Sequence, residues 1–272
     1  MTNAVRAAWL ALAVVPGALD GGGASALSAW MVWFAWAAVA LSLLLPHPLS
    51  LTTCRFVAPL LTAHSAWMLA DAGSEATWGA VVGAVVSGAV TVILFRSAYG
   101  ATHAQAAAYG HERRHLLRPP VSVVLPVALL WALVGVAAAI AVHADRLVTA
   151  GVSAAVCVVI LGFSLRRGVV LARRWLVFVP AGIAVHDPLV LRDTFMVRNH
   201  DVRALQPASS GTEAFDATCT TWGATLELVL SHPHDVSLSQ FGARVSRTLD
   251  RLHVTSLLVA PSRPNEALAN RS

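Results

Sequence analysis

The sequence is poor in charge, has no lysine and contains only 3 cysteines. Charged residues make up 12% of the 272 positions, whereas a soluble globular domain carries about 25%. The shortage is concentrated in residues 1–165, which excludes an ordinary soluble fold for this part of the chain. Cys54, Cys157 and Cys219 do not have the spacing of a metal or redox motif, so we interpret them as small packing residues.

In place of charge, six apolar stretches fill the first 165 residues. A helix of about 20 apolar residues crosses the hydrocarbon core of a bilayer. The stretches cover residues 7–19, 26–45, 51–70, 77–95, 121–142 and 147–165. We therefore predict an α-helical integral membrane bundle of six transmembrane helices over residues 1–172. A small cytoplasmic domain is expected over residues 173–272.

The first stretch has two interpretations. It is short, contains Pro16 and is followed by Ala24-Ser25-Ala26, a pattern that also fits a signal peptide with a small-residue cleavage site. Residues 1–26 are either a span or a segment that is removed, which would leave five spans. The C-terminus is expected in the cytoplasm in both cases.

Charged residues between the spans are distributed unequally. Asp20, Asp71, Glu75 and Asp145 fall in the short connections on one side, where Arg146 is the only basic residue. The other side carries 10 of the 19 arginines, namely Arg6, Arg55, Arg96, Arg113, Arg114, Arg118, Arg166, Arg167, Arg173 and Arg174. Cytoplasmic loops carry the excess of basic residues. The pattern predicts a multi-pass protein with both termini in the cytoplasm. The exclusive use of arginine, with abundant alanine, indicates a GC-rich bacterial genome and hence a bacterial plasma membrane.

The sequence pI of about 10.0 does not indicate nucleic-acid binding. Residues 1–174 hold 11 arginines and 5 acids, whereas residues 175–272 hold 8 arginines and 9 acids. The positive excess therefore lies beside the membrane, where it attracts anionic lipid headgroups of the inner leaflet. The arginines expected to contact these headgroups are Arg113, Arg114, Arg118, Arg166, Arg167, Arg173 and Arg174.

Two features of the membrane half carry structural or functional hypotheses. Gly79, Gly83 and Ser87 form a small-xxx-small series on one helix face, which lets helix backbones approach closely. His64 is the best intramembrane polar candidate, because ionisable groups within spans often mark a transport path. A neutral histidine bonded to a neighbouring helix is the other interpretation. A small permease or transport component stays an alternative function.

The loop after the fourth stretch contains the pattern HExxH, from His111 through Glu112 to His115. On a helix, this pattern places two histidines on one zinc ion with the glutamate as general base. The two intervening arginines disfavour a dication, and Pro119 and Pro120 limit the helix to about two turns. A positively charged, lipid-facing loop is the interpretation that we adopt, with a zinc hydrolase as an alternative. We predict no catalytic residue, metal or cofactor for the chain.

From Trp175 onward the periodicity is that of a β-rich domain with some helix. Strand-like runs cover residues 175–179, 183–186, 194–198, 202–205, 224–230, 235–238 and 253–260, with helices over 241–252 and 264–270. Many short strands separated by turns suggest a small sandwich or barrel. Between the first two strands, Pro180-Ala181-Gly182 predicts a tight turn with a positive φ at the glycine.

Two stretches resemble known families. The run from Arg173 to Val190, RRWLVFVPAGIAVHDPLV, resembles an uncharacterised family of actinobacterial multi-spanning membrane proteins. The ending from Leu257 to Pro264, LLVAPSRP, is similar to the last strand and helix start of bacterial PH-like domains. The first resemblance implies no activity. The second implies a module that binds lipid headgroups or protein segments, although this domain departs from a phosphoinositide binder because it lacks a lysine-rich loop.

The C-terminal domain contains one cluster of metal-ligand type, His232-Pro233-His234-Asp235. Two histidines and a carboxylate suit a divalent ion, but a polar turn between strands is the interpretation that we adopt. The favoured function is non-enzymatic. The helices anchor the protein, and the cytoplasmic domain binds an unidentified protein or a lipid at the inner leaflet.

Overall fold

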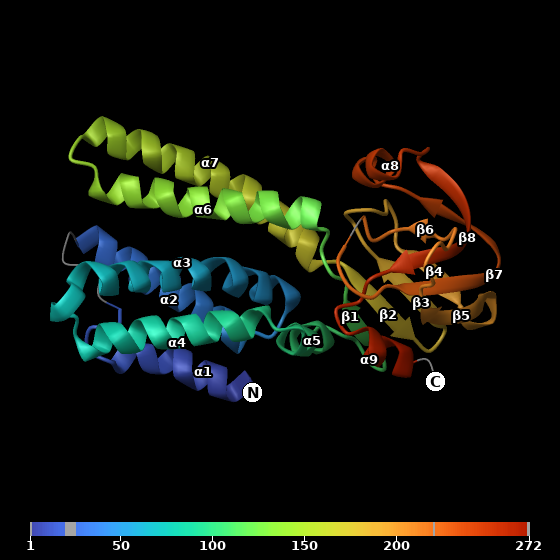
Figure 1. Ribbon diagram of the computed structural model, residues 1–272, viewed down its shortest axis with the longest axis horizontal. Helices are drawn as coiled ribbons and strands as arrows, with labels where there is room; N and C mark the ends of the chain where they lie inside the picture. Colours follow the sequence, from blue (N-terminus) through green and yellow to red (C-terminus); the bar gives the residue numbers. More distant parts are fainter. Residues whose placement is uncertain (1, 20–25, 220, 271–272) are drawn as a thin grey trace. The chain divides into compact units, whose positions relative to one another are not determined.

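The computed structural model describes residues 2–19, 26–219 and 221–270 (Figure 1). The chain forms two compact units. The first consists of Met1–Gly100 and Ala128–Arg166, and the second of Ala101–Val127 and Arg167–Ser272. The loop between the fourth and fifth apolar stretches therefore belongs with the C-terminal part of the chain.

The first unit is helical. Its elements are α1 (Thr2–Ala11), η1 (Leu12–Val14), α2 (Ala26–Leu44), α3 (Pro48–Ala72), η2 (Gly73–Glu75), α4 (Trp78–Phe95) and most of α6 (Val121–His143) and α7 (Leu147–Ala172). The short helix α5 (Ser97–Ala106) crosses from the first unit to the second. Among the residues that the structure describes, three helices are long and apolar enough to cross a membrane, namely α4, α6 and α7.

The first and third predicted spans differ from these. Helix α1 has 10 residues, about 15 Å of helix, against a hydrocarbon core of about 30 Å. The stretch 7–19 is thus not one continuous helix. The 19-residue α2 is apolar along its length, whereas the 25-residue α3 is less apolar because it includes Arg55, His64 and Asp71. Ala24 and Ser25 of the cleavage pattern lie outside the described residues.

Local signals explain where α3 and α4 begin. The His47 ring accepts a hydrogen bond from the amide of Leu49 (3.2 Å), and Pro48 occupies the first helical position, where its missing N–H costs nothing. The Thr77 hydroxyl accepts a hydrogen bond from the amide of Ala80 (3.2 Å). Both caps satisfy amides that have no partner within the helix.

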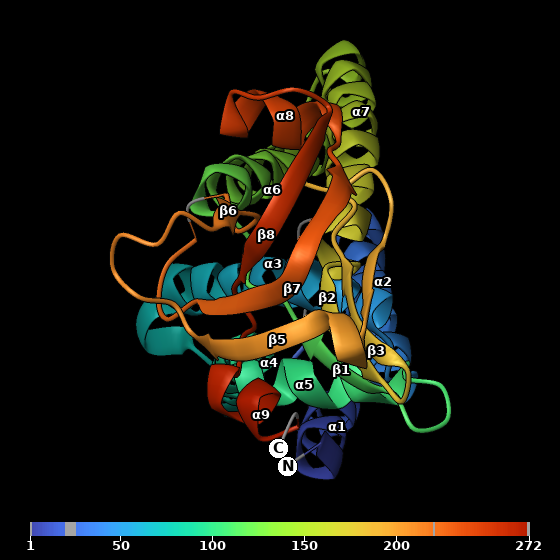
Figure 2. The same cartoon turned by 90° about the vertical axis from the view of Figure 1, so that its right-hand side faces the viewer.

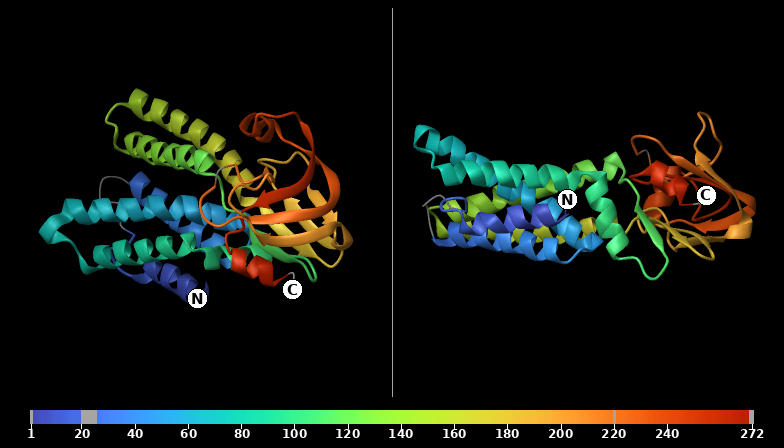
Figure 3. Two further views of the ribbon diagram at one scale, coloured as in Figure 1. Left: turned by 45° about the vertical axis from the view of Figure 1, so that its right-hand side comes forward. Right: turned by 90° about the horizontal axis from the view of Figure 1, so that it is seen from below.

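The helices α1 to α4 pack against each other (Figures 1 and 3). Trp9 of α1 donates its indole N–H to the Trp36 carbonyl (3.0 Å), and Trp36 of α2 donates to the Trp9 carbonyl (2.9 Å). The buried face of α4 includes Gly79, Gly83 and Ser87. A Cβ at Gly79 would lie 1.7 Å from the Pro16 carbonyl oxygen, so this face packs on backbone of the same chain.

The second unit contains two four-stranded sheets. The first is antiparallel, in the order β1 (Arg113–Leu116), β2 (Trp175–Val179), β3 (Gly182–His186) and β4 (Phe195–Arg198), and α6 and α7 lie between β1 and β2 in the chain. The second has the order β5 (Val202–Pro207), β7 (Leu226–Ser237), β8 (Arg251–Val259) and β6 (Phe215–Asp216). Figures 2 and 3 show β5, β7 and β8 side by side. Helix α8 (Gln240–Ser246) precedes β8, and α9 (Pro264–Ala269) follows it.

The strand predictions for β2, β3 and β8 agree with the structure, and the helix expected over 241–252 ends at Ser246 because Arg247 adopts a left-handed conformation (φ 51°). Gly182 was expected to need a positive φ, and this was wrong. It is required instead by close packing, because a Cβ there would lie 2.0 Å from the Val197 carbonyl oxygen on β4.

One core fills the second unit, and residues outside the sheets contribute to it. Side chains from both sheets form the buried cluster, including Leu176, Val185, Leu228 and Leu257. Val123 of α6 and Val170 and Leu171 of α7 pack against this cluster. The ends of α6 and α7 that lie in this unit are therefore part of the β domain's own packing.

Candidate functional site

The HExxH pattern does not form a helix. His111 lies in an exposed turn, and His115 lies in β1, which pairs with β2. The Glu112 carboxylate accepts hydrogen bonds from Arg114 Nε (3.0 Å) and Nη2 (2.8 Å). These bonds hold the pKa of Glu112 below its usual range. The helical zinc arrangement considered for this pattern is therefore not formed.

His115 is buried in the domain instead of facing a metal. Its Nε2 lies 2.8 Å from Nδ2 of Asn270, and its ring meets the edge of Phe178 with centroids 5.6 Å apart. Burial lowers the pKa of His115 from the ordinary value of 6.5. A neutral imidazole that joins β1 to the residue after α9 is a structural element.

The arginines expected at the lipid surface fall into two groups. Arg113, Arg166, Arg167 and Arg173 are exposed. Arg114 pairs with Glu112 and lies over the Trp175 ring at 4.6 Å, and Arg118 bonds the Ala224 carbonyl. Burial lowers the pKa of Arg118.

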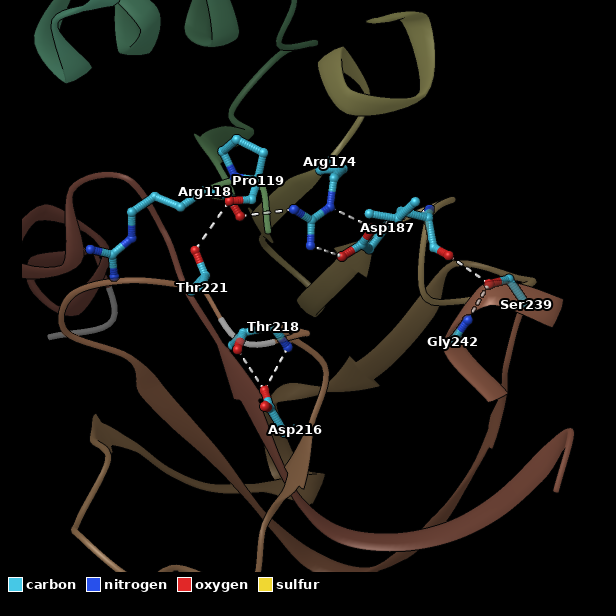
Figure 4. Close-up of polar contacts among 10 residues, drawn as sticks. Arg118, Pro119, Arg174, Asp187, Asp216, Thr218, Thr221, Ser239 and Gly242 are labelled. Carbon is cyan, nitrogen blue, oxygen red and sulfur yellow. Dashed lines mark hydrogen bonds and ion pairs between the residues drawn. The ribbon is translucent and has the colours of Figure 1, made fainter. Parts of the chain in front are cut away.

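Arg174 is incompatible with the predicted lipid contact, because its side chain is only 1% exposed. It forms a bidentate ion pair with Asp187, with Nε to Oδ1 at 2.7 Å and Nη2 to Oδ2 at 2.6 Å (Figure 4). Its Nη1 donates to the Arg118 carbonyl at 2.8 Å. Arg174 is thus a structural residue that links the inter-span loop, β2 and the turn after β3.

In the helical unit, His64 lies on α3 and is half-buried. The neighbouring Thr62 hydroxyl lies 2.9 Å from the Thr91 hydroxyl of α4, and Thr62 also bonds the Ala58 carbonyl (2.9 Å). The contact between the two hydroxyls joins α3 to α4.

The described β domain has an open cleft of about 480 Å³. It lies between β4 and the C-terminal half of β7. Its lining includes Asp193, Thr194, Asp201, His234 and Ser237, so much of it is polar. Phe195 and Val236 form apolar parts of the wall. A cleft of this size suits a small polar ligand or a side chain of a partner.

Asp201 and His234, which line this cleft, lie close to His232, and one ligand atom of each of the three residues lies within 4.8 Å of the others. The Asp201 Oδ1 is 3.6 Å from His232 Nε2, and its Oδ2 is 3.9 Å from His234 Nε2. His200 Nε2 also lies 3.4 Å from Oδ1. We refer to Asp201, His232 and His234 as the His–Asp cluster.

The sequence indicated the two histidines but the wrong carboxylate. Asp235 follows His234 on β7 and therefore points to the other side of the strand. There it contacts His253 of β8. Asp201 comes from the short helix η3 (Asn199–Asp201) between β4 and β5. Only the pairing of β5 with β7 brings it beside the histidines.

No family model, curated protein or solved structure matches this chain. No residue role is therefore transferred from a relative, and the function is argued from the geometry of the two units.

Proposed function

We propose that this protein is a multi-pass protein of a bacterial plasma membrane whose cytoplasmic, PH-like β domain binds a protein or lipid at the inner leaflet. In this proposal the first segment crosses the bilayer as α1 together with the residues that follow it, which do not continue the α-helix, and α2 and α3 join α4, α6 and α7 there. Both termini are cytoplasmic, and the protein belongs with the actinobacterial membrane proteins that residues 173–190 resemble. The protein acts as an anchor and binding module and not as an enzyme.

The main support for this proposal is that segments next to the candidate spans are built into the β domain. Strand β1 comes from the loop between α4 and α6 and pairs with β2. Beyond β1, the Leu117 amide donates to the Arg174 carbonyl (2.9 Å), and the Arg118 amide donates to the Ala260 carbonyl (2.7 Å). Three chain connections therefore join the domain to candidate spans, which is what a module held at the membrane surface requires.

The PH-like assignment is supported by topology. The ending LLVAPSRP begins in β8 and leads into α9, which is the order of strand and helix that the resemblance implies. The exposed Arg113, Arg167 and Arg173 lie on the segments that enter and leave the domain. Each arginine beside an anionic surface contributes about 1 kcal/mol of attraction.

Hydrogen exchange of the full chain in nanodiscs tests the lipid contact. We expect amides of residues 107–118 and 166–174 to exchange more slowly in nanodiscs with anionic lipid than in zwitterionic ones. The double variant Arg113→Glu/Arg173→Glu should lose this difference. The matched control Arg203→Glu/Arg244→Glu changes two other exposed arginines and should retain it. Equal exchange in both lipids for the wild type would reject the lipid-facing surface and leave a protein partner as the ligand.

A further inference from the structure

We propose that the His–Asp cluster is a binding site for a divalent cation of the zinc class, at the end of the cleft between β4 and β7. The site would use Nε2 of His232 and His234 and a carboxylate oxygen of Asp201. It is independent of which partner the β domain binds.

The spacing of the donor atoms is close to that around a bound ion. Zinc–nitrogen and zinc–oxygen bonds are about 2.0–2.2 Å, so two ligands of a tetrahedral ion lie roughly 3.4 Å apart. The Asp201 oxygens lie 3.6 Å and 3.9 Å from the two histidine nitrogens. These two distances involve different oxygens, and the three ligand atoms lie within 4.8 Å of one another. Side-chain rotation has to bring them closer to complete the geometry.

Two aspartates near β7, Asp201 and Asp235, differ in how they contact histidines. The Asp201 carboxylate lies 3.4–3.9 Å from nitrogens of His200, His232 and His234, and all three distances are longer than a direct hydrogen bond of 2.7–3.2 Å. Asp235 and His253 are in direct contact. Asp201 thus faces several imidazoles at ligand spacing, whereas Asp235 has one close partner.

The backbone of β7 is shaped to present the two histidines. Its pairing with β8 shifts between Val229, opposite Ser256, and His234, opposite Val254. The extra residues on β7 form a bulge that includes Pro233, which donates no backbone hydrogen bond. Bulges re-aim side chains near functional sites. The rings of His232 and His234 lie 4.5 Å apart with an interplanar angle of 86°.

The donor set defines the class of ion. Imidazole suits zinc, copper and nickel, whereas calcium and magnesium take oxygen ligands. Three protein ligands leave one tetrahedral position open. That position can be filled by His200, whose side chain is 70% exposed, or by a ligand in the cleft, since Asp201 and His234 also line it.

Metal binding to the full chain tests the site directly. The protein is purified in detergent with a tag that lacks histidine, stripped with a chelator and titrated with Zn²⁺. We expect one zinc per chain for the wild type. The double variant His232→Ala/His234→Ala should bind zinc at least about 10-fold more weakly. Loss of a residue that only supports a metal ligand already lowers metal affinity about 10-fold or more, and here two ligands themselves are removed. The control His111→Ala/His253→Ala removes two exposed histidines outside the cluster and should bind like the wild type.

Two further measurements distinguish loss of a metal ligand from a folding defect in the double variant. Asp201→Ala keeps both histidines and should also weaken zinc binding. X-ray absorption of the zinc-loaded wild type should show imidazole and oxygen ligands at about 2.0–2.2 Å. Absence of stoichiometric zinc in the wild type, or equal binding by wild type and both cluster variants, would overturn the proposal. Loss of zinc in the control alone would assign the binding to surface histidines and overturn it equally.

Discussion

Arg174 and Asp187 form a bidentate ion pair in which each side chain is 1% exposed. The third guanidinium nitrogen bonds the Arg118 carbonyl, and the Leu189 amide donates to Asp187 Oδ1 (3.2 Å). The guanidinium and the carboxylate therefore both have hydrogen-bond partners beyond each other, which is the condition under which burial of an ion pair is tolerated. It fixes the inter-span loop, the start of β2 and the turn after β3 in one arrangement.

Removal of one member of this pair should strongly destabilise the β domain. Arg174→Met leaves the Asp187 carboxylate buried without its partner, which costs about 3–5 kcal/mol. Denaturant unfolding of the purified full chain, followed by tryptophan fluorescence, measures the change. The double variant Arg174→Met/Asp187→Leu should lose less than the two single variants together.

The neighbouring exposed Arg173 supplies the control. Arg173→Met should change the free energy of unfolding by no more than about 0.5 kcal/mol. If Arg174→Met is as mild as Arg173→Met, the pair does not hold the domain together.

Close packing on α4 predicts opposite effects for two glycines in one helix. A Cβ at Gly79 would lie 1.7 Å from the Pro16 carbonyl oxygen, whereas at Gly88 the nearest atom is a Thr62 methyl at 3.7 Å. Gly79→Ala should cost about 1–3 kcal/mol through overpacking. Gly88→Ala should be neutral or stabilise by up to about 1 kcal/mol, because alanine favours the helix.

Thermal unfolding in detergent distinguishes the two variants. A lower midpoint for Gly79→Ala, with an equal or higher one for Gly88→Ala, is expected. Equal midpoints would show that the segment around Pro16 does not pack on α4 in solution.

The β domain should lose stability as the pH falls below about 6.5. Burial lowers the pKa of His115 and of His186 from the ordinary value of 6.5. For each histidine, the pKa is lower in the folded chain than in the unfolded chain, so between these values the unfolded chain binds more protons. The contribution to the free energy of unfolding is therefore fully present above about pH 6.5 and declines as the pH drops below it.

The variant His115→Gln keeps a hydrogen-bonding side chain near Asn270 and removes one titrating group. Its unfolding free energy should depend less steeply on pH between 7 and 5 than that of the wild type. A wild-type free energy that is flat or rises on acidification would contradict this assignment.

The proposed topology makes a labelling prediction. Single cysteines at Ser74 and Ala144 lie in the two connections expected outside the cell, and a cysteine at His111 lies in the loop expected inside. A membrane-impermeant maleimide on intact cells should label the first two, and His111→Cys only after permeabilisation. The wild type gives the background, since its described cysteines are buried or half-buried. Labels on Ser74→Cys and Ala144→Cys from opposite sides would reject the six-span arrangement.

The sequence by itself determined the helical and β-rich regions, because both follow from local patterns. Long apolar runs produced α4 and α6 within one residue of the expected bounds, and α7 from its expected start to Ala172, beyond the expected end at residue 165. Alternating and β-branched runs produced β2, β3 and β8. A pattern of this kind specifies an element by the surface that it must bury.

Local patterns were misleading where a partner distant in the chain determines the conformation. HExxH reads as a helix, yet Arg113–Leu116 forms β1 because β2 offers it a hydrogen-bonding edge. From its position beside Arg173, Arg174 was expected to face lipid, but its side chain is buried in an ion pair with Asp187. In both cases the partner that determines the conformation is not a neighbour in the sequence, so local composition does not predict the contact.

The His–Asp cluster divides in the same way. His232 and His234 are recognisable from spacing alone, because alternate residues of a strand share a face. The choice of Asp201 over Asp235 depends on the pairing of β5 with β7 and on the bulge in β7. The amino-acid sequence thus determined which segments are apolar, helical or extended, whereas the tertiary structure decided which polar side chains meet, since that depends on strand register and long-range packing.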